Sequence, residues 1–153
     1  MTVRRMHELP RQQSAEELAE LFEGRTRFVE RLAGEDDPLA RARTLVHELP
    51  YDEKVEALAA HPAISQRHGL SAASAAEHGP APDDDPAVLA ELTRLEHEYE
   101  KRHGFCFVVF VNQRPKAEIL DVLRERIDNS TEDELEAGLR ELVEIAEDRW
   151  RSR

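Results

Sequence analysis

The sequence predicts an all-α protein, a single-domain bundle of about six to eight helices with one short extended segment at residues 105–111. Apolar residues recur at helical spacing through most of the chain, and capping residues and prolines mark where these stripes begin and end. The length of 153 residues and the 40% share of hydrophobic residues are enough for one packed core. We therefore interpret residues 1–153 as one domain, with a loosely ordered tail at residues 1–13.

The first helix is expected from about Ala15 to Ala33. Ser14 and Glu17 have the Ser-x-x-Glu form of a capping box, which marks a helix start. The apolar side chains that share one stripe of this helix are Leu18, Leu21, Phe22, Val29 and Leu32. Their spacing predicts one continuous helix across the region.

Two shorter helices are expected next. Pro38 can occupy the first turn of a helix that ends near Pro50. A third helix should end at His61, because Pro62 disfavours helical geometry in the residue before it. The apolar stripes of these two helices are Leu39, Ala42, Leu45 and Val46, then Val55, Leu58 and Ala59.

The second half of the chain begins with an exposed loop at residues 79–86, which is rich in proline and aspartate. Its last aspartate, Asp85, is expected to cap the next helix. Helical spacing resumes after Pro115. Thr131 and Glu134 form another capping-box pair, which predicts that the last helix begins there.

The run from Phe105 to Val111 breaks the helical pattern. It follows Gly104, which should end the preceding helix, and its β-branched and aromatic residues are typical of a buried extended segment. Because no second run of this kind exists, its backbone groups must find partners in turns, side chains, water or a ligand rich in amide-like groups. The alternative, that the run continues a buried helix, stays open at this point.

The charge balance limits the classes of partner. The 21 Lys and Arg against 33 Asp and Glu leave a net charge of −12, which disfavours an extended nucleic-acid face. The longest apolar run is too short to span a bilayer. A single cysteine, Cys106, and the absence of an N-terminal apolar stretch favour a reducing compartment, and the last residues do not form a peroxisomal signal. We expect a soluble, cytoplasmic domain that binds neither nucleic acid nor membranes.

His61 is the most suggestive of the seven histidines. It borders the apolar face of its short helix near the C-terminus, and a near-neutral pKa would suit acid–base chemistry. A purely structural histidine is the alternative. Ser74 and Glu77 would share one face of a helix, although the same pair also fits a plain helix cap.

Arg149 continues the core stripe of the last helix, because it lies at helical spacing from Leu142 and Ala146. A guanidinium on a buried face needs an anionic or carbonyl partner. The alternative is a side chain that reaches solvent near the C-terminus. The sequence contains no metal-ligand spacing and no phosphate-binding glycine cluster. If the chain is an enzyme, these residues favour chemistry by a histidine, a carboxylate and an arginine without a cofactor.

Several short motifs occur in a fixed order along the chain. They are Leu21-Phe22-Glu23, Leu58-Ala59-Ala60-His61-Pro62, Ser74-Ala75-Ala76-Glu77, His103-Gly104-Phe105-Cys106-Phe107, Arg126-Ile127-Asp128-Asn129 and Arg149. A His-Pro pair followed by Ser-x-x-Glu and then Gly-Phe-x-Phe is specific as an ordered set. In this order the chain resembles the 2-oxo-4-hydroxy-4-carboxy-5-ureidoimidazoline (OHCU) decarboxylase family of the urate-degradation pathway.

The resemblance implies an all-helical enzyme that is commonly dimeric and needs no cofactor. It implies that His61 is the catalytic histidine and Glu77 the catalytic glutamate, while Ser74 and Arg149 bind the substrate. The extended segment would line the pocket and present backbone groups to a hydantoin-like ring. The segment residues with this implied role are Phe105, Phe107, Val108 and Val109.

The implied function is decarboxylation of OHCU to (S)-allantoin, a carboxy-lyase reaction of purine catabolism. The expected partners are therefore a small anionic substrate and a second copy of the chain in a homodimer. Two alternatives stay open. One is a decarboxylase-like enzyme that acts on a related ureido or hydantoin acid, and the other is a non-catalytic helical binding domain of the same fold.

Overall fold

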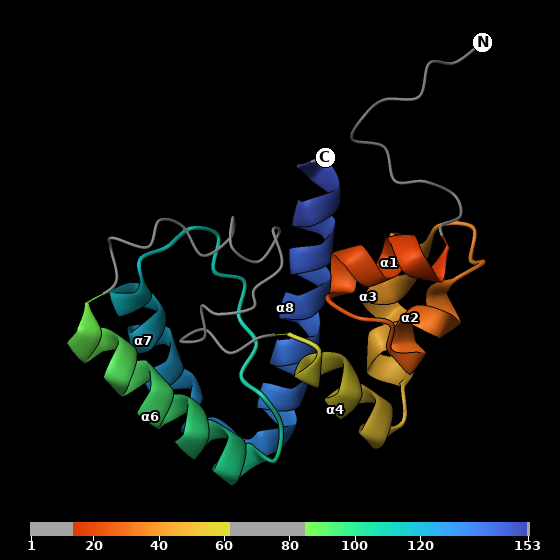
Figure 1. Cartoon of the computed structure of the whole chain (residues 1–153). Helices are drawn as coiled ribbons and strands as arrows, with labels where there is room; N and C mark the ends of the chain where they lie inside the picture. The colour runs from red at the N-terminus through yellow and green to blue at the C-terminus, as the bar shows by residue number, and fades with distance from the viewer. Residues whose placement is uncertain (1–13, 62–84, 153) are drawn as a thin grey trace.

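The computed structural model describes residues 14–61 and 85–152, and the regular secondary structure within these ranges is entirely α-helical (Figure 1). The helices are α1 (Ala15–Phe22), α2 (Arg27–Leu32), α3 (Pro38–Glu48), α4 (Tyr51–Ala59), α6 (Pro86–His103), α7 (Lys116–Arg126) and α8 (Thr131–Arg151). The predicted all-α class is confirmed, whereas the predicted tail at residues 1–13 lies outside the described ranges. None of the described helices is long and apolar enough to cross a membrane.

Helix α8 lies at the centre of the fold. It packs against α1, α3 and α4 on one side, while α6 and α7 lie on the other (Figure 1). Its residues Leu139, Leu142 and Ala146 have no exposed surface. These positions recur every three to four residues, which is the spacing of a helix face turned to a core. Segments from both halves of the chain therefore meet on α8.

The predicted first helix is wrong as a continuous element, because the chain turns between α1 and α2. Helix α1 ends at Phe22, and Glu23 takes a left-handed conformation with φ of 67°. Helix α2 then begins after Thr26, whose hydroxyl accepts the Val29 N–H at 3.3 Å. Both helices bury their apolar residues in the same core, so apolar residues keep their helical spacing across the turn. The spacing alone therefore does not show the break.

The predicted start of the last helix at Thr131 is confirmed, but its predicted cap is wrong by one residue. Ser130, not Thr131, is the N-cap, and its hydroxyl accepts the Asp133 N–H at 3.1 Å. Glu134 therefore does not complete a capping box. It is buried, with 1% of its surface exposed, and its carboxylate binds other helices.

Three other predicted helix boundaries are confirmed. Ser14 and Glu17 form the capping box at the start of α1. The Asp85 carboxylate accepts the Ala87 N–H at 2.8 Å at the start of α6, and Gly104 ends α6 with φ of 84°. A side chain at Gly104 would be strained, because L residues rarely adopt this conformation.

The run at residues 105–111 contains no helix. In Figure 1 it is an extended trace that passes alongside α8. The alternative of a continued helix is therefore wrong. Side chains supply part of the backbone pairing that a sheet would otherwise provide. Arg126 Nη1 donates to the Val108 carbonyl oxygen at 3.1 Å. Arg114 Nη2 donates to the Phe110 carbonyl oxygen at 2.6 Å.

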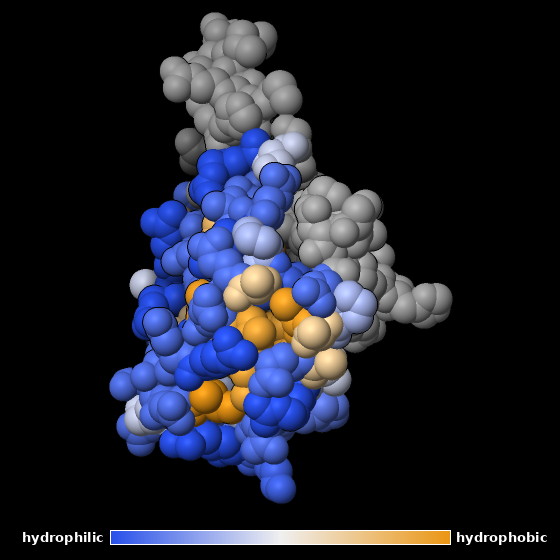
Figure 2. All heavy atoms as spheres, turned by 90° about the vertical axis from the view of Figure 1, so that its left-hand side faces the viewer, coloured by the Kyte–Doolittle hydropathy of each residue, from blue (hydrophilic) through white to orange (hydrophobic). Residues whose placement is uncertain are grey.

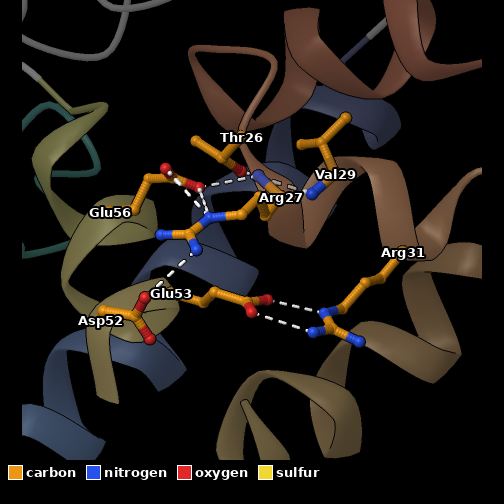
Figure 3. Close-up of polar contacts among 7 residues, drawn as sticks. All are labelled: Thr26, Arg27, Val29, Arg31, Asp52, Glu53 and Glu56. Atoms are coloured by element: carbon orange, nitrogen blue, oxygen red, sulfur yellow. Dashed lines mark hydrogen bonds and ion pairs between the residues drawn. The ribbon is translucent and has the colours of Figure 1, made fainter. Parts of the chain in front are cut away.

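Ion pairs hold α4 against α2 (Figure 3). Arg31 Nε and Nη2 donate to the two carboxylate oxygens of Glu53 at 2.6 and 2.9 Å. The Arg27 backbone N–H and its Nε donate to Glu56, at 2.8 and 3.3 Å. Glu53 is buried although Arg31 is half exposed. Because His61 follows the last turn of α4, these contacts help to set where His61 lies.

The surface on the side of α6 and α7 is mostly hydrophilic (Figure 2). Its hydrophobic residues appear in a patch near the middle of this view and in a second, smaller group below it. Within the described residues, Tyr51 is the large hydrophobic side chain that is well exposed. Such a surface agrees with the net charge of −12.

Candidate active site

His61 lies just beyond α4 and is buried, with 9% of its surface exposed. The helix ends at Ala59 rather than at His61 as predicted, but His61 is buried, as expected for a residue that borders the apolar side. Neither Nδ1 nor Nε2 has a hydrogen-bond partner within the part of the chain that the structure describes. Buried polar atoms almost always have partners, because an unpaired one has lost its hydration without compensation. The two ring nitrogens therefore make His61 a candidate for binding a ligand or moving a proton.

Arg149 lies on the buried face of α8, with 6% of its surface exposed. Its Nη1 donates to the Leu21 carbonyl oxygen at 3.0 Å, and its Nη2 lies 2.9 Å from Glu23 Oε1. The predicted need for an anionic or carbonyl partner is confirmed, since the guanidinium has one of each. The alternative of a side chain that reaches solvent is wrong.

Glu23 is a residue that sequence reasoning did not select for the site, although it belongs to the Leu21-Phe22-Glu23 motif. Its carboxylate is 12% exposed and pairs with Arg149. A side-chain Cβ added at Gly24 would lie 3.5 Å from the Ala60 Cβ, so the end of α1 packs against the end of α4. This turn gathers Glu23, Arg149 and His61, which we call the His61 cluster.

Burial in the His61 cluster changes the protonation of the imidazole. Burial first, and then the positive charge of Arg149, lower the pKa of His61 to about 4, while Glu23 acts in the opposite direction. At pH 7 the imidazole is therefore neutral, with one N–H donor and one acceptor nitrogen. The predicted near-neutral pKa is wrong, because desolvation outweighs the favourable position at a helix C-terminus.

The four segment residues with an implied binding role are all buried: Phe105, Phe107, Val108 and Val109. The rings of Phe105 and Phe107 pack on Tyr99, with centroids 6.0 and 5.1 Å apart. Within residues 14–61 and 85–152, no hydrogen bond engages the N–H of Phe107, Val108 or Val109. These ring contacts join the segment to α6, and none of them joins it to His61.

A second group of polar side chains, centred on the buried Glu134, lies where α6, α7 and α8 meet. Glu134 Oε1 accepts the Tyr99 hydroxyl at 2.7 Å and Arg126 Nε at 2.9 Å. Its Oε2 accepts the Asn129 amide at 2.9 Å. Arg126 also covers the Phe107 ring at 4.8 Å. We call Tyr99, Arg126, Asn129 and Glu134 the Glu134 network.

Ser74 and Glu77 lie outside the described residues, so their implied roles stay predictions. Among the residues that the structure does describe, no group of three His, Cys, Asp or Glu could hold a metal ion. A surface pocket of about 400 Å³ lies between α3 and α8, and Arg43 and Glu147 are among its lining residues. Arg43 Nε and Glu147 Oε2 form an ion pair with each other at 2.5 Å.

The described geometry defines a class of site. An all-α scaffold places a neutral, buried imidazole beside an arginine whose guanidinium is anchored to the end of α1. Such a combination can move a proton and hold an anionic oxygen in the same place.

The family of the chain follows from comparison with known proteins. The model of the OHCU decarboxylase family matches residues 7–151, and the chain belongs to this family. The 2-oxo-4-hydroxy-4-carboxy-5-ureidoimidazoline decarboxylase of Haloferax volcanii is 28% identical over 114 residues, which are 73% of this chain and 68% of that protein. The uric acid degradation bifunctional protein TTL of Arabidopsis thaliana is 32% identical over 100 residues, which are 61% of this chain and 31% of that protein.

Two solved structures share the fold. A crystal structure of OHCU decarboxylase in the presence of (S)-allantoin matches with a TM-score of 0.73 and 24% identity, over 92% of this chain and 97% of that one. A crystal structure of (S)-allantoin synthase matches with a TM-score of 0.65 and 24% identity, over 90% of this chain and 48% of that one. The all-helical bundle is therefore the fold of known members of this class.

Proposed function

We propose that the chain decarboxylates OHCU to (S)-allantoin in urate degradation, without a cofactor. The observation that carries the proposal is a buried His61 with two unpartnered ring nitrogens beside the anchored Arg149, in a chain of this family. A scaffold protein has no need of this pair, because an unpartnered buried imidazole and a buried guanidinium both oppose folding.

The proposed reaction removes CO₂ from a carbon that also bears a hydroxyl. The electron pair of the broken carbon–carbon bond becomes enolate character in the ring, and a proton must then add to carbon. Arg149 would hold an anionic or carbonyl oxygen of the substrate by charge-assisted hydrogen bonds. This contact places the reacting carbon beside the imidazole, and such positioning lowers the barrier.

The lowered pKa of His61, about 4, assigns it a direction of proton transfer. A neutral imidazole first accepts the hydroxyl proton, and the imidazolium that forms then returns a proton to the ring carbon. Glu77 would stabilise that imidazolium, and Ser74 would orient the ring. Proton delivery from one face of the ring would produce a single enantiomer.

The extended segment would complete the pocket. The N–H groups of Phe107, Val108 and Val109 are candidates for hydrogen bonds to the ring, because no hydrogen bond engages them within residues 14–61 and 85–152. Backbone donors held in fixed positions stabilise charge that develops on an oxygen. Arg126 supports this role by binding the Val108 carbonyl oxygen.

The proposed function is tested with freshly generated OHCU, by comparing its loss and (S)-allantoin formation with and without the protein. We expect His61→Ala and Glu77→Ala each to lower turnover by about 10²-fold or more. The exposed residues His97 and Glu118 provide matched controls as His97→Ala and Glu118→Ala. A wild-type rate equal to the spontaneous rate would contradict the proposal, and unchanged rates in the variants would contradict the assigned roles. A panel of related ureido and hydantoin acids, followed by CO₂ release, tests the substrate.

The cytoplasmic location and the homodimer are also part of this proposal. The location is supported by the net charge of −12 and by the mostly hydrophilic face in Figure 2, and the homodimer by the resemblance to a commonly dimeric family. Light scattering coupled to gel filtration would measure the mass in solution. A mass equal to that of one chain at working concentration would contradict the dimer.

A further inference from the structure

Glu23 occupies a backbone position that favours glycine. Its φ of 67° lies in the left-handed region, where helices commonly end on glycine and where most other residues are strained. The chain has a glycine one residue later, at Gly24, yet it places a glutamate in the left-handed position. A non-glycine residue in such a conformation points to a requirement for its side chain.

The side chain of Glu23 is used at the candidate site. Its Oε1 lies 2.9 Å from Arg149 Nη2, and both side chains are almost fully buried, with 12% and 5% exposed. Arg149 Nη1 donates to the carbonyl oxygen of Leu21, which lies two residues before Glu23 in the chain. Two acceptors from one turn therefore hold two nitrogens of the same planar guanidinium, which restricts both its position and its orientation.

The charges around His61 depend on the same pair. Among the described residues, the charged groups that act on His61 are Arg149 on α8 and Glu23 at the end of α1, and their effects oppose each other. If Glu23 were absent, Arg149 would lose this carboxylate, and the effect of Glu23 that opposes the positive charge of Arg149 at His61 would be gone. A buried charge that loses its partner is costly and reorganises its surroundings.

We propose that Glu23 is a positioning residue of this site, which holds the guanidinium of Arg149 in the orientation that receives the substrate and balances its charge beside His61. This inference rests on the proposed function for its effect on turnover. The contact between Glu23 and Arg149 and the effect on His61 are properties of the free protein. They can be tested without any substrate.

Two substitutions separate the position of Glu23 from its charge. Glu23→Gln keeps the length and an acceptor oxygen but removes the charge. Glu23→Gly removes the side chain at a position whose backbone favours glycine. Glu16→Gln is the matched control, because Glu16 is an exposed carboxylate on α1 that pairs with Arg25. Folding of each variant is checked by circular dichroism and thermal unfolding.

We expect Glu23→Gly to lower kcat/KM by at least about tenfold, because a misplaced binding group costs catalysis, with a smaller loss in Glu23→Gln. We expect Glu23→Gln to shift the acidic limb of the kcat/KM profile to lower pH, because the charge that favours protonated His61 is gone. Glu16→Gln should match the wild type in both measurements. If the role of Glu23 were purely structural, the variants would have a lower melting temperature, but the folded enzyme would keep its kcat/KM and the position of the acidic limb of its pH profile. This result would overturn the inference.

A titration of the His61 ring by NMR in wild type and Glu23→Gln provides the readout that needs no substrate. A lower pKa in the variant supports the inference even if the wild type fails to act on OHCU, which would overturn only the proposed function. An unchanged pKa of His61 overturns the charge coupling. If Glu23→Gly does not fold, the near-isosteric Glu23→Gln decides the question.

Discussion

Two buried arginine–glutamate pairs in the described part of the chain differ in what surrounds them. In the Glu134 network, both carboxylate oxygens of Glu134 are occupied, by Tyr99 and Arg126 on one oxygen and by Asn129 on the other. In the His61 cluster, the Glu23 pair with Arg149 lies beside an imidazole that has no hydrogen-bond partner in the described part of the chain. Both pairs hold α8 to another part of the fold.

In the Glu134 network one nitrogen, Arg126 Nη2, has no hydrogen-bond partner among the described residues, whereas both ring nitrogens of His61 lack one. An engaged carboxylate favours a structural role, and an imidazole without any partner favours a functional one. A buried polar network whose carboxylate is fully engaged makes one arrangement of its helices favourable, because any other leaves charges unpaired. A buried group that stays unpaired lowers stability and is kept where it serves a ligand or a reaction. We therefore expect the Glu134 network to respond to substitution mainly in stability, and the His61 cluster mainly in activity.

The largest effect is expected from Glu134→Ala. It leaves Arg126 buried without its carboxylate and removes the acceptor for Tyr99, so the free energy of unfolding should fall by about 3–5 kcal/mol. Urea unfolding measures the change. Glu132→Ala is the control, because Glu132 is exposed in the first turn of the same helix. Equal losses in the two variants would show that the network does not stabilise the fold.

A pH effect on stability is expected from His61. Its pKa is about 4 in the folded chain and about 6.5 in the unfolded chain. Between these two pH values the unfolded chain therefore binds more protons than the folded chain does. Stability should therefore fall as the pH drops from about 6.5, by up to about 3 kcal/mol. Urea unfolding of wild type and His61→Gln at several pH values isolates this effect from that of the carboxylates. Parallel curves for the two proteins would contradict the lowered pKa.

A smaller effect on activity is expected from Arg149→Lys. A lysine keeps the charge but cannot hold the Leu21 carbonyl and Glu23 with a planar fork, so kcat/KM should fall roughly 10-fold to 100-fold. Steady-state kinetics with OHCU measures the loss. Arg140→Lys, at an exposed position of α8, is the matched control. If both variants keep wild-type kcat/KM, the orientation of the guanidinium has no part in the reaction.

The smallest effect is expected from salt. The net charge of −12 repels an anionic substrate, and added salt screens this repulsion more than it screens the buried Arg149. Raising the ionic strength from about 0.02 to about 0.2 M should therefore lower KM modestly. A KM that rises steeply with salt would show that local attraction to Arg149 outweighs the acidic surface.

Local signals in the sequence were enough for much of the fold. Ser14, Asp85 and Gly104 act on backbone groups within a few residues of themselves, and the structure confirms the helix boundaries that they predict. The break after α1 was missed because the left-handed turn at Glu23 leaves the apolar spacing of the two helices intact. The start of α8 at Thr131 is confirmed, but its N-cap is Ser130 rather than Thr131, and local pattern alone does not decide between two residues that are both able to cap.

The sequence by itself determined which chemical groups the site could use. Helical spacing predicts without a structure that Arg149 lies on the buried face of α8 and that His61 borders the apolar side of α4, and both side chains are buried. Only the tertiary structure decided which groups meet and how they are charged. Glu23 reaches Arg149 from the other end of the chain, and no local pattern encodes a contact across that separation. The lowered pKa of His61 likewise arises from burial by several helices, which exists only after the core has formed.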